Sequence, residues 1–460
     1  MPRTLVTLVA ALALIIMAKG ALKRETVCRL TLYPSGHYVN WTCPQQKTVY
    51  AEKGLYTPKN ILASRVQMSG PRAFILTPRF LCGVPFTLGM ICINGPCKAE
   101  PLLSPYPSWD SHDSGEKGIV NAVDIFIDRK KILWILDVGI VDTLEKPKVV
   151  GPPKVLAICT MTWKIVATVD LSQFCTYDSR FHEIQVEVTE EDDTFIYVSD
   201  AGCKAIVVWD YSREAGFKVQ LPPEVAEDGS CKDILYLTLL NNNYLYFSFM
   251  NGRKMFRTPT SNLRCPKSLT EAEEVGTKPG KLVILGSDRK RKMFFRGKGD
   301  NQIYMWDSSR PFKACSFVPV DAPPQGMYST HVVVGSMKYV WALSSNFPDF
   351  AGGNRGSIGP YVKLHPIMSL RCPEEGNGNG NGNENGNENG NSSCNCPPPT
   401  SPSPQKCTGP PKSPPPPKCP GPSKCPGPPT CTGPTKCGGP QKCPGPPTCT
   451  GCRRCSRVFG

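Results

Sequence analysis

The sequence predicts an all-β fold, a six-bladed β-propeller followed by a Gly/Asn-rich disordered spacer and a cysteine- and proline-rich tail. The prediction depends on a short aromatic or β-branched run that recurs along the chain. Its copies start at Ala73, Leu133, Phe195, Tyr244, Met293 and Val340. Successive starts lie 60, 62, 49, 49 and 47 residues apart. Such runs are typical of β-strands, and a strand unit repeated at this interval is typical of propeller blades.

Three of the runs continue through a polar turn into a second predicted strand. These second strands are Ala205–Asp210, residues 253–257 and residues 302–307, and the first and third of them end in Trp-Asp. Two strands joined by a short turn form a hairpin. Each repeat is therefore expected to contribute at least one hairpin to a blade.

The beginning of the chain resembles a secretory signal. Arg3 precedes an almost wholly apolar stretch over residues 5–17, and small residues follow in residues 18–20. We expect residues 1–20 to be a signal peptide and the protein to be secreted, with no membrane span, although an uncleaved anchor is the alternative. The 23 cysteines would then mostly pair in an oxidising compartment, and one would be left over. Asn40 and Asn391 each lie in a glycosylation sequon.

Composition divides the chain into a globular part and a tail. Residues 21–372 are the expected propeller, whereas residues 371–457 contain no Ala, Val, Ile, Leu, Met, Phe, Trp or Tyr. A segment without apolar side chains cannot offset its ordering entropy by burial. Residues 373–396 are therefore predicted to be a flexible Gly/Asn-rich spacer, and residues 397–460 a separate Pro/Cys-rich tail.

Cysteines in the tail follow a six-residue period. They are Cys407, Cys419, Cys425, Cys431, Cys437, Cys443 and Cys449, where only the first step is twelve residues. A proline-rich chain extends by about 3.1 Å per residue, so six residues span roughly 19 Å, which is too far for neighbouring thiols to pair. This spacing favours disulfides to other chains. Internal pairing through bends is one alternative, and a metal–thiolate cluster at Cys394–Cys396 or Cys452–Cys455 is another.

The charge is strongly positive and unevenly distributed. The chain carries a net +15, and the residues beyond Glu388 contribute six lysines, three arginines and no acid. In a secreted protein this favours acidic extracellular surfaces or polymers, and nucleic acid is not an expected partner. The basic run at residues 289–292 is predicted to be a solvated turn, with a dedicated binding patch as the alternative.

An ordered set of segments carries a resemblance to a known family. The segments are residues 79–88, 105–109, 133–144, 151–154, 195–200, 206–211, 259–264 and 341–348. In this order they resemble the yellow and major royal jelly proteins of insects, over roughly residues 40–372. The resemblance implies a secreted six-bladed propeller. It leaves function open, because the family includes pigmentation proteins, dopachrome-converting enzymes, salivary amine binders, eggshell components and food proteins.

One departure from the family limits what can be carried over. Gly151 stands where the family has a cysteine, and Cys159, Cys175, Cys203 and Cys231 match no family position. The disulfide pairing of the family is therefore not transferred to this chain.

No motif of a known catalytic class is found. The chain has no P-loop, dinucleotide-binding glycine pattern, HExxH zinc motif or nucleophile elbow, and its five histidines have no metal-ligand spacing. We expect no cofactor and no metal, so that an enzyme here would depend on simple proton transfer. The catalytic candidates are His331, which begins an apolar run, and Asp137 and Asp200, which follow predicted strands in two blades. A core-edge position for the histidine and turn capping for the aspartates are the alternatives.

The central channel is the default ligand pocket of a propeller. The resemblance to salivary amine binders implies Thr330, Asn346 and Phe347 as ligand-binding residues, with a structural turn as the alternative. An ammonium ligand would need a polar acceptor and an aromatic face.

These observations lead to three functional hypotheses. The first is a secreted structural component of an insect extracellular matrix, such as eggshell or cuticle, joined to other matrix proteins through disulfides of the tail. The second is a dopachrome-converting enzyme of the melanin pathway. The third is a binder of small aromatic amines or catechols.

Overall fold

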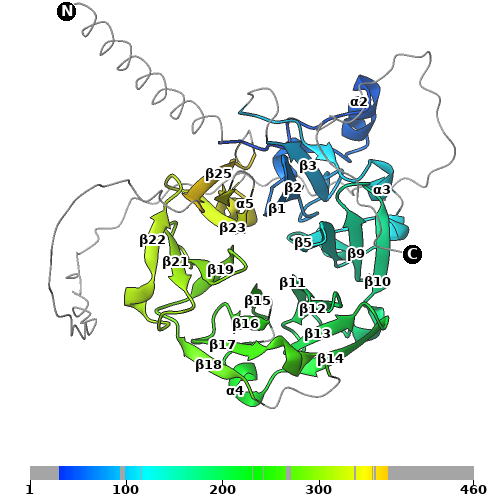
Figure 1. The fold of residues 1–460 in the computed structure, drawn as a ribbon. Coiled ribbons are helices and arrows are strands. Elements are labelled where there is room, and N and C mark those ends of the chain that lie inside the picture. The colour runs from blue at the N-terminus through cyan, green and yellow to red at the C-terminus, as the bar shows by residue number, and fades with distance from the viewer. Residues whose placement is uncertain are drawn as a thin grey trace, which may run out of the picture. The chain divides into compact units, whose positions relative to one another are not determined.

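A computed structural model shows a six-bladed β-propeller, as the sequence predicts, with the blades arranged around a central channel (Figure 1). The residues that it describes are 31–93, 99–113, 115–230, 232–241, 243–265, 271–335, 338–354, 356 and 359–370. The predicted signal peptide, the spacer, the periodic tail and the Asn391 sequon lie outside these residues.

The first three blades are four-stranded antiparallel sheets. Blade one consists of β1 (Arg65–Ser69), β2 (Arg72–Leu76), β3 (Leu88–Cys92) and β4 (Ser104–Pro105). Blade two consists of β5 (Ala122–Ile127), β6 (Ile132–Asp137), β9 (Lys154–Cys159) and β10 (Ile165–Asp170). Blade three consists of β11 (Phe181–Val188), β12 (Thr194–Asp200), β13 (Ala205–Asp210) and β14 (Ala215–Gln220). A small hairpin, β7 (Ile140–Val141) and β8 (Lys148–Val149), extends from blade two.

The last three blades continue the ring. Blade four consists of β15 (Leu235–Leu240), β16 (Tyr244–Phe249), β17 (Lys254–Pro259) and β18 (Glu273–Thr277). Blade five consists of β19 (Leu282–Ser287), β20 (Lys292–Gly297), β21 (Ile303–Asp307) and β22 (Val318–Asp321). Blade six consists of β23 (Tyr328–Val334), β24 (Tyr339–Ser345) and β25 (Val362–Ser369).

The six recurring runs all fall in the second strand of a blade. They correspond to β2, β6, β12, β16, β20 and β24, and the predicted hairpin partners correspond to β13, β17 and β21. These strands have a continuous apolar pattern because both faces of each sheet are covered by neighbouring blades. Every residue of β6 and of β12 is buried. The core accordingly lies between adjacent blades, in clusters that each draw on two or more sheets.

Irregularities in the innermost strands shape the channel. In the described chain, four of the six inner strands shift register against their partner, which is the signature of a β-bulge. The shifts lie at residues 122–124, 181–184, 284–286 and 329–331. Gly286 in blade five has φ +137°, and a Cβ there would lie 2.1 Å from the carbonyl oxygen of Val332. Only glycine fits this close approach of β19 to β23, so the bulge brings two blades into direct backbone contact.

The ring is closed by the segment that precedes blade one. Leu32 donates its N–H to the Leu364 carbonyl at 2.9 Å and accepts the Leu364 N–H at 2.8 Å, which places it beside β25 of blade six. The outer edge of the three-stranded blade six is thereby paired over this short stretch. The Leu32 side chain is buried in the cluster shared by blades six and one.

Short helices lie before β1 and in the loops between strands. They are α2 (Pro44–Glu52), α3 (Asp110–Asp113), α4 (Pro223–Ala226) and α5 (Phe347–Ala351), with single 3₁₀ turns at Pro58–Asn60, Gly115–Lys117, Ser172–Phe174, Thr260–Leu263 and Ala314–Ser316. Among the described residues, none of the helices has both the length and the apolar character needed to cross a bilayer.

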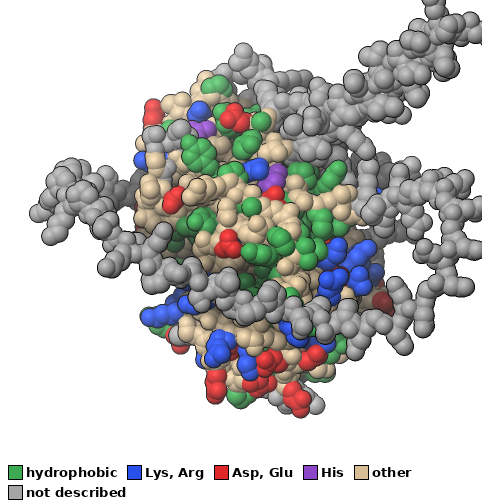
Figure 2. Space-filling view, turned by 90° about the vertical axis from the view of Figure 1, so that its left-hand side faces the viewer, with side chains coloured by type: hydrophobic (Ala, Val, Ile, Leu, Met, Phe, Trp, Pro, Cys, Tyr) green, Lys and Arg blue, Asp and Glu red, His purple; other side chains and the backbone are tan. Residues whose placement is uncertain are grey.

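Charged side chains on the outside are partly paired across strands. In blade four, Lys254 lies 2.7 Å from Glu274, and Arg257 lies 2.6 Å from Glu273. Figure 2 shows a face of the propeller on which acidic and basic side chains lie next to one another at the lower end. Exposed pairs of this kind contribute little to stability, so the fold depends mainly on the apolar contacts between blades.

We predict that ring closure by Leu32 is needed for stability. Replacing Leu32, which is 4% exposed, by Ala should lower the free energy of unfolding by about 2–4 kcal/mol, because it leaves a cavity at the junction of blades six and one. The matched control Leu102→Ala changes a side chain that is 57% exposed and should stay within about 0.5 kcal/mol of the parent. Denaturant unfolding of the three proteins measures this, and equal losses for both variants would contradict the closure.

Candidate functional site

Polar side chains converge in the central channel, where all six innermost strands contribute to the wall. The cavity there has a volume of about 40 Å³, enough for a few water molecules. Its charged and hydrogen-bonding lining includes Arg65, Gln67, Asp124, Glu183, Gln185, Thr238, Ser287, Arg289 and His331. A small-molecule ligand of drug size needs several hundred Å³, so it would have to bind at a mouth of this channel rather than inside it.

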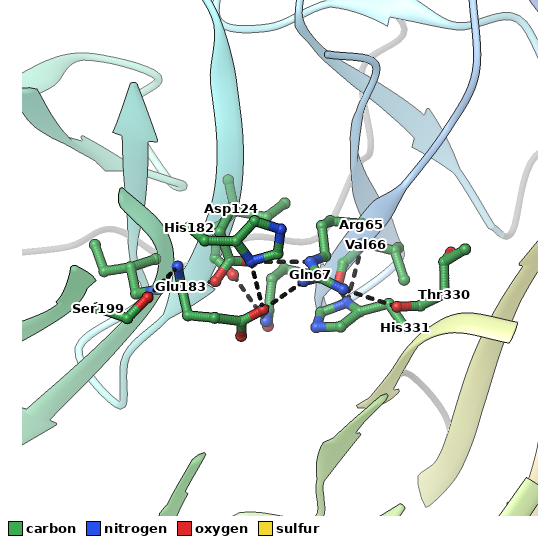
Figure 3. A network of polar contacts seen from close by, with 11 residues as sticks. Arg65, Val66, Gln67, Asp124, His182, Glu183, Ser199, Thr330 and His331 are labelled. Atoms are coloured by element: carbon green, nitrogen blue, oxygen red, sulfur yellow. Dashed lines mark hydrogen bonds and ion pairs between the residues drawn. The ribbon is translucent and has the colours of Figure 1, made fainter. Parts of the chain in front are cut away.

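Arg65 of β1 is the centre of this polar group. Its Nη2 donates to Glu183 Oε1 of β11 at 2.5 Å, and its Nε lies 3.4 Å from Asp124 Oδ1 of β5. Its Nη1 donates to the Thr330 carbonyl of β23 at 2.8 Å. Figure 3 shows the side chains of Asp124, His182 and Glu183 facing Arg65. These four residues, Arg65, Asp124, His182 and Glu183, are called the channel network below.

The carboxyl group of Asp124 in this network has a strongly raised pKa. Burial raises the pKa of its carboxyl to about 8, the charge of Glu183 adds to this effect, and Arg65 opposes it. Asp124 Oδ2 also accepts the N–H of Ile184 at 2.8 Å, which ties blade two to blade three. The pKa of Asp124 is higher in the folded state than in the unfolded state. The contribution of protonated Asp124 to the free energy of unfolding is therefore complete below about pH 4 and is lost as the pH rises toward 8. A carboxyl that titrates near neutral pH can exchange protons under ordinary conditions.

His182 and Glu183 form the part of the network that solvent can reach. Nδ1 of His182 lies 3.1 Å from Glu183 Oε1, and the His182 side chain is 36% exposed whereas that of Glu183 is 9% exposed. Successive residues of a regular strand point to opposite faces, but the bulge at residues 181–184 lets both side chains meet. The Glu183 N–H is held by Ser199 Oγ at 3.0 Å, so the second strand of the blade fixes the position of the carboxylate.

Aromatic and cationic side chains surround this pair. The ring of Tyr236 meets the His182 imidazole edge to face, with centroids 6.5 Å apart. Burial, and then the charge of Glu183, raises the pKa of Tyr236, so its phenol stays protonated. Arg296 lies over the Tyr328 ring at 5.5 Å from its centroid, and its Nε–H donates to the Ser329 carbonyl at 2.8 Å. A planar, electron-poor ligand at this mouth would find ring faces as well as hydrogen-bond donors.

The opposite end of the channel is occupied by Arg289. Its Nη2 donates to Gln67 Oε1 at 2.9 Å, its Nη1 donates to the Ile127 carbonyl, and its guanidinium stacks on Phe126 at 4.3 Å from the ring centroid. Burial lowers the pKa of Arg289 to about 10. The prediction that residues 289–292 form a solvated turn is therefore wrong for Arg289, whose side chain turns into the channel because the carbonyl and amide acceptors of blades one and two lie there. A separate hollow of about 270 Å³ adjoins it.

His331, a predicted catalytic residue, lies in the channel wall at the junction of blades six and one. Its Nδ1 lies 2.9 Å from the Val66 carbonyl oxygen and 3.2 Å from the Val66 nitrogen. Burial, and then the charge of Arg65, lowers the pKa of His331 well below its usual value, so the imidazole is neutral at physiological pH. Its position is close to the network, but no contact between the His331 side chain and the carboxylates is among its hydrogen bonds in the described chain.

Asp137 and Asp200 are held apart from the channel by the backbone of their own blades. The Asp137 carboxylate accepts N–H groups of Val120 at 2.7 Å and Asn121 at 2.8 Å. The Asp200 carboxylate accepts from Ser179 Oγ at 2.8 Å and pairs with Lys218 at 2.9 Å. Both side chains are fully buried, and each fastens the loop that leads into the inner strand of its blade. These contacts correspond to turn capping, the alternative to a catalytic role for Asp137 and Asp200.

Thr330, Asn346 and Phe347, the predicted amine-binding residues, have contacts within the protein. Thr330 Oγ1 donates to the Leu343 carbonyl at 3.3 Å, and Asn346 Oδ1 accepts the Tyr361 N–H at 2.9 Å. Phe347, in α5, packs edge to face against Phe80 with centroids 5.8 Å apart. Only Thr330 joins the network, through its carbonyl bond to Arg65. Their role in ligand binding stays a prediction.

Of the remaining predicted sites, only one lies in the described residues. The Asn40 side chain is partly exposed, and its Nδ2 donates to Ser104 Oγ at 3.1 Å, a bond that attachment of a glycan would replace. The predicted crosslinking cysteines of the tail lie outside the described residues. Within those residues, no three His, Cys, Asp or Glu side chains are grouped so as to hold a metal ion.

The sequence analysis did not predict the channel network, because its four members are scattered over residues 65–183. One local signal was available. Asp124 interrupts the apolar run of β5, and a charged residue inside an otherwise apolar strand is a candidate for a buried polar role. Nothing in the sequence indicated the bulge that brings His182 and Glu183 to the same side.

Curated relatives resemble the propeller part of this chain. Dopaminechrome tautomerase of Drosophila melanogaster is 24% identical, and the match covers 65% of this chain and 73% of that protein. Protein yellow of Drosophila madeirensis is 26% identical, and the match covers 65% of this chain and 58% of that protein. The chain thus spans less than two thirds of the length of this yellow protein.

Solved structures give a more distant likeness. Regucalcin, a calcium-binding protein of Agrobacterium tumefaciens, is 11% identical, with a TM-score of 0.42 and coverage of 68% of this chain and 92% of that chain. A likeness at this level carries no information about activity.

The family relationship follows from a match to a model that describes a whole protein family. The family model described as major royal jelly protein matches residues 120–358, which is more than half of the 460-residue chain. The match extends from β5 to the loop before β25, and so includes Asp124, His182 and Glu183. This chain therefore belongs to the yellow and major royal jelly protein family.

Proposed function

We propose that the propeller is a tautomerase that moves a proton within a small quinone-type aromatic molecule at the channel mouth. The observation that carries this proposal is the hydrogen-bonded series from His182 through Glu183 to Arg65, with Asp124 beside it. It joins a solvent-accessible imidazole to a buried carboxylate and a buried cation. Further support comes from the relative named dopaminechrome tautomerase.

His182 is the proposed proton carrier. With its Nδ1 directed at Glu183 Oε1, the ring presents Nε2 as the atom that can accept a proton from a ring carbon of the substrate. The carboxylate of Glu183 orients the imidazole and stabilises the imidazolium that forms. The imidazolium then gives a proton to an oxygen of the same substrate, so the product is an isomer and no other reactant is consumed.

Asp124 and Arg65 set the charge around this pair. When Asp124 is protonated, Arg65 and Glu183 balance one another, and the network has no net charge from these three groups. Loss of the Asp124 proton adds a negative charge next to Glu183. The network can therefore adjust its proton affinity near neutral pH without a metal or a cofactor.

The size of the channel defines where the substrate would bind. A cavity of about 40 Å³ does not admit a bicyclic ring, whereas the His182 side chain is 36% exposed and packs against Tyr236, which lies near Arg296. The substrate ring would thus lie over His182, with its oxygen atoms toward the hydrogen-bond donors Tyr236 and Arg296.

We predict that His182→Asn lowers kcat for conversion of dopaminechrome by about 100-fold or more and changes KM little, because the residue carries the proton rather than most of the binding. Glu183→Gln should have an effect of the same order, since the amide cannot stabilise an imidazolium. The measurement is the decay of dopaminechrome absorbance with the purified full chain.

The matched control is His37→Asn, which makes the same replacement at an exposed site. It should leave the rate unchanged. Full activity of His182→Asn, or a full chain that does not accelerate the decay at all, would rule out the proposed tautomerase.

A second function is proposed for the tail. We propose that the protein is secreted and that its periodic tail cysteines join it by disulfides to neighbouring proteins of an insect extracellular matrix, such as eggshell or cuticle. The specific observation is the six-residue spacing of these cysteines in a proline-rich segment without large apolar residues until its last three positions. A tethered propeller could still carry out proton transfer in its channel, so the two functions are compatible.

The prediction for the tail concerns solubility. The native protein should leave its tissue in strong denaturant only when a thiol reductant is present, because the crosslinks are disulfides. Replacement of the seven periodic cysteines by serine should allow release without reductant. The matched control Cys265→Ser, at an exposed propeller cysteine, should still require it. Ready release of the unaltered chain as a monomer without reductant would contradict the crosslinking role.

A further inference from the structure

Two cysteines of blade three lie on loops that pack against each other. Cys175 follows the 3₁₀ turn Ser172–Phe174 in the loop between β10 and β11, and Cys203 lies in the turn between β12 and β13. Both are free thiols in this structure, Cys175 exposed and Cys203 partly exposed.

Shared hydroxyl partners bring the two thiols together. Cys203 Sγ lies 3.1 Å from Oγ1 of Thr176, the residue next to Cys175, and 3.5 Å from Ser179 Oγ. Burial raises the pKa of the Cys175 thiol, and the charge of Asp200 adds to this effect. Cys175 also interacts with Ser179 and with Cys203 itself, so the two thiols are neighbours in the fold.

Hydrogen bonds to backbone N–H groups hold the loop and the turn in this position. The Asp200 carboxylate accepts the N–H of Arg180 at 2.9 Å and that of Cys203 at 3.1 Å, so one side chain spans both segments. Ala201 also donates its N–H to the Arg180 carbonyl at 3.2 Å. At Gly202 a Cβ would lie 1.6 Å from the Asp178 carbonyl oxygen, which leaves no room between the segments.

A basic group lies beside the same thiols. Lys218 Nζ pairs with Asp200 Oδ2 at 2.9 Å, and its side chain is 18% exposed. Although burial lowers the pKa of Lys218, contacts with Asp200 and Cys203 raise it overall. Lys218 thereby places an ammonium group beside Cys203.

We propose that Cys175 and Cys203 are oxidised to an intramolecular disulfide that fastens the β10–β11 loop to the β12–β13 turn. The thiolate of Cys203 attacks one sulfur of a small disulfide oxidant such as oxidised glutathione and releases one glutathione thiol. Cys175 then displaces the second glutathione from the mixed disulfide. In total the two cysteines lose two protons and two electrons, and one glutathione disulfide becomes two thiols.

The bond would fix the entry to β11. Arg180, two residues before His182, is already tied to Asp200, and a covalent link would make this attachment permanent. Because the disulfide closes a loop of about 28 residues in the unfolded chain, it should also stabilise the propeller. The inference stands independently of the proposed tautomerase, since it concerns the thiols alone.

Trypsin offers a direct test, because the cleavage sites Lys164, Arg180 and Lys204 place the two cysteines in separate peptides. These are residues 165–180 and 181–204, and each contains a single cysteine. The full chain is equilibrated with oxidised and reduced glutathione, alkylated, digested without reduction and analysed by mass spectrometry. We expect the two peptides to be joined to each other and to separate when a reductant is added.

Variants give an independent readout. Cys175→Ser and Cys203→Ser should each lower Tm by a few degrees under oxidising conditions, and the double variant should lose no more than either single variant. Cys315→Ser, at another exposed thiol, should not change Tm in this way. Alkylation of both cysteines in the oxidised sample, or a link from either one to a different cysteine, would overturn the proposal.

Discussion

The buried guanidinium of Arg65 is the interaction on which the centre of the propeller depends. It reaches from blade one to the carboxyl group of Asp124 in blade two, the carboxylate of Glu183 in blade three and a backbone carbonyl of blade six. A buried cation is tolerated only when its charge and its donors are compensated, so these partners have to stay in place together. Four blades are thereby held in register around one side chain, next to the seam where the ring closes.

The same constraint explains why the inner strands are irregular. A regular strand would direct alternate side chains into the channel, whereas the bulges at residues 122–124 and 181–184 re-aim Asp124, His182 and Glu183 toward Arg65. At the other end of the channel, Arg289 fills the space between blades one, two and five. The two ends of the channel are consequently chemically distinct. Its reactive groups gather at the mouth that exposes His182.

The sequence predicted the scaffold well and the site poorly, for a physical reason. Second strands such as β6 and β12 are apolar on both faces, because blades cover them on both sides, and this leaves a strong local pattern. The site has no such pattern, since Arg65 and Glu183 are 118 residues apart and meet only after the ring has formed. The bulges depend on packing between blades, and so does the inward turn of Arg289. Asp137 and Asp200 were visible as strand-ending aspartates, but only the structure shows their backbone partners.

The match to the major royal jelly protein family covers residues 120–358 of the propeller, and the cysteine-rich tail lies outside it. In the proposed function, the propeller carries the proton-transfer groups, and the cysteine-rich tail supplies a different chemistry. Covalent attachment and proton transfer would then belong to separate parts of one molecule.

The central claim is that Asp124 holds a proton near neutral pH beside Arg65 and Glu183. Infrared difference spectroscopy of the full chain, compared with Asp124→Asn, measures this directly through the C=O stretch of a protonated carboxyl group. We expect a band near pH 6 that disappears as the pH passes about 8 and that is missing in the variant. A band of equal size in the variant, or no protonated carboxyl group near pH 6, would contradict the account.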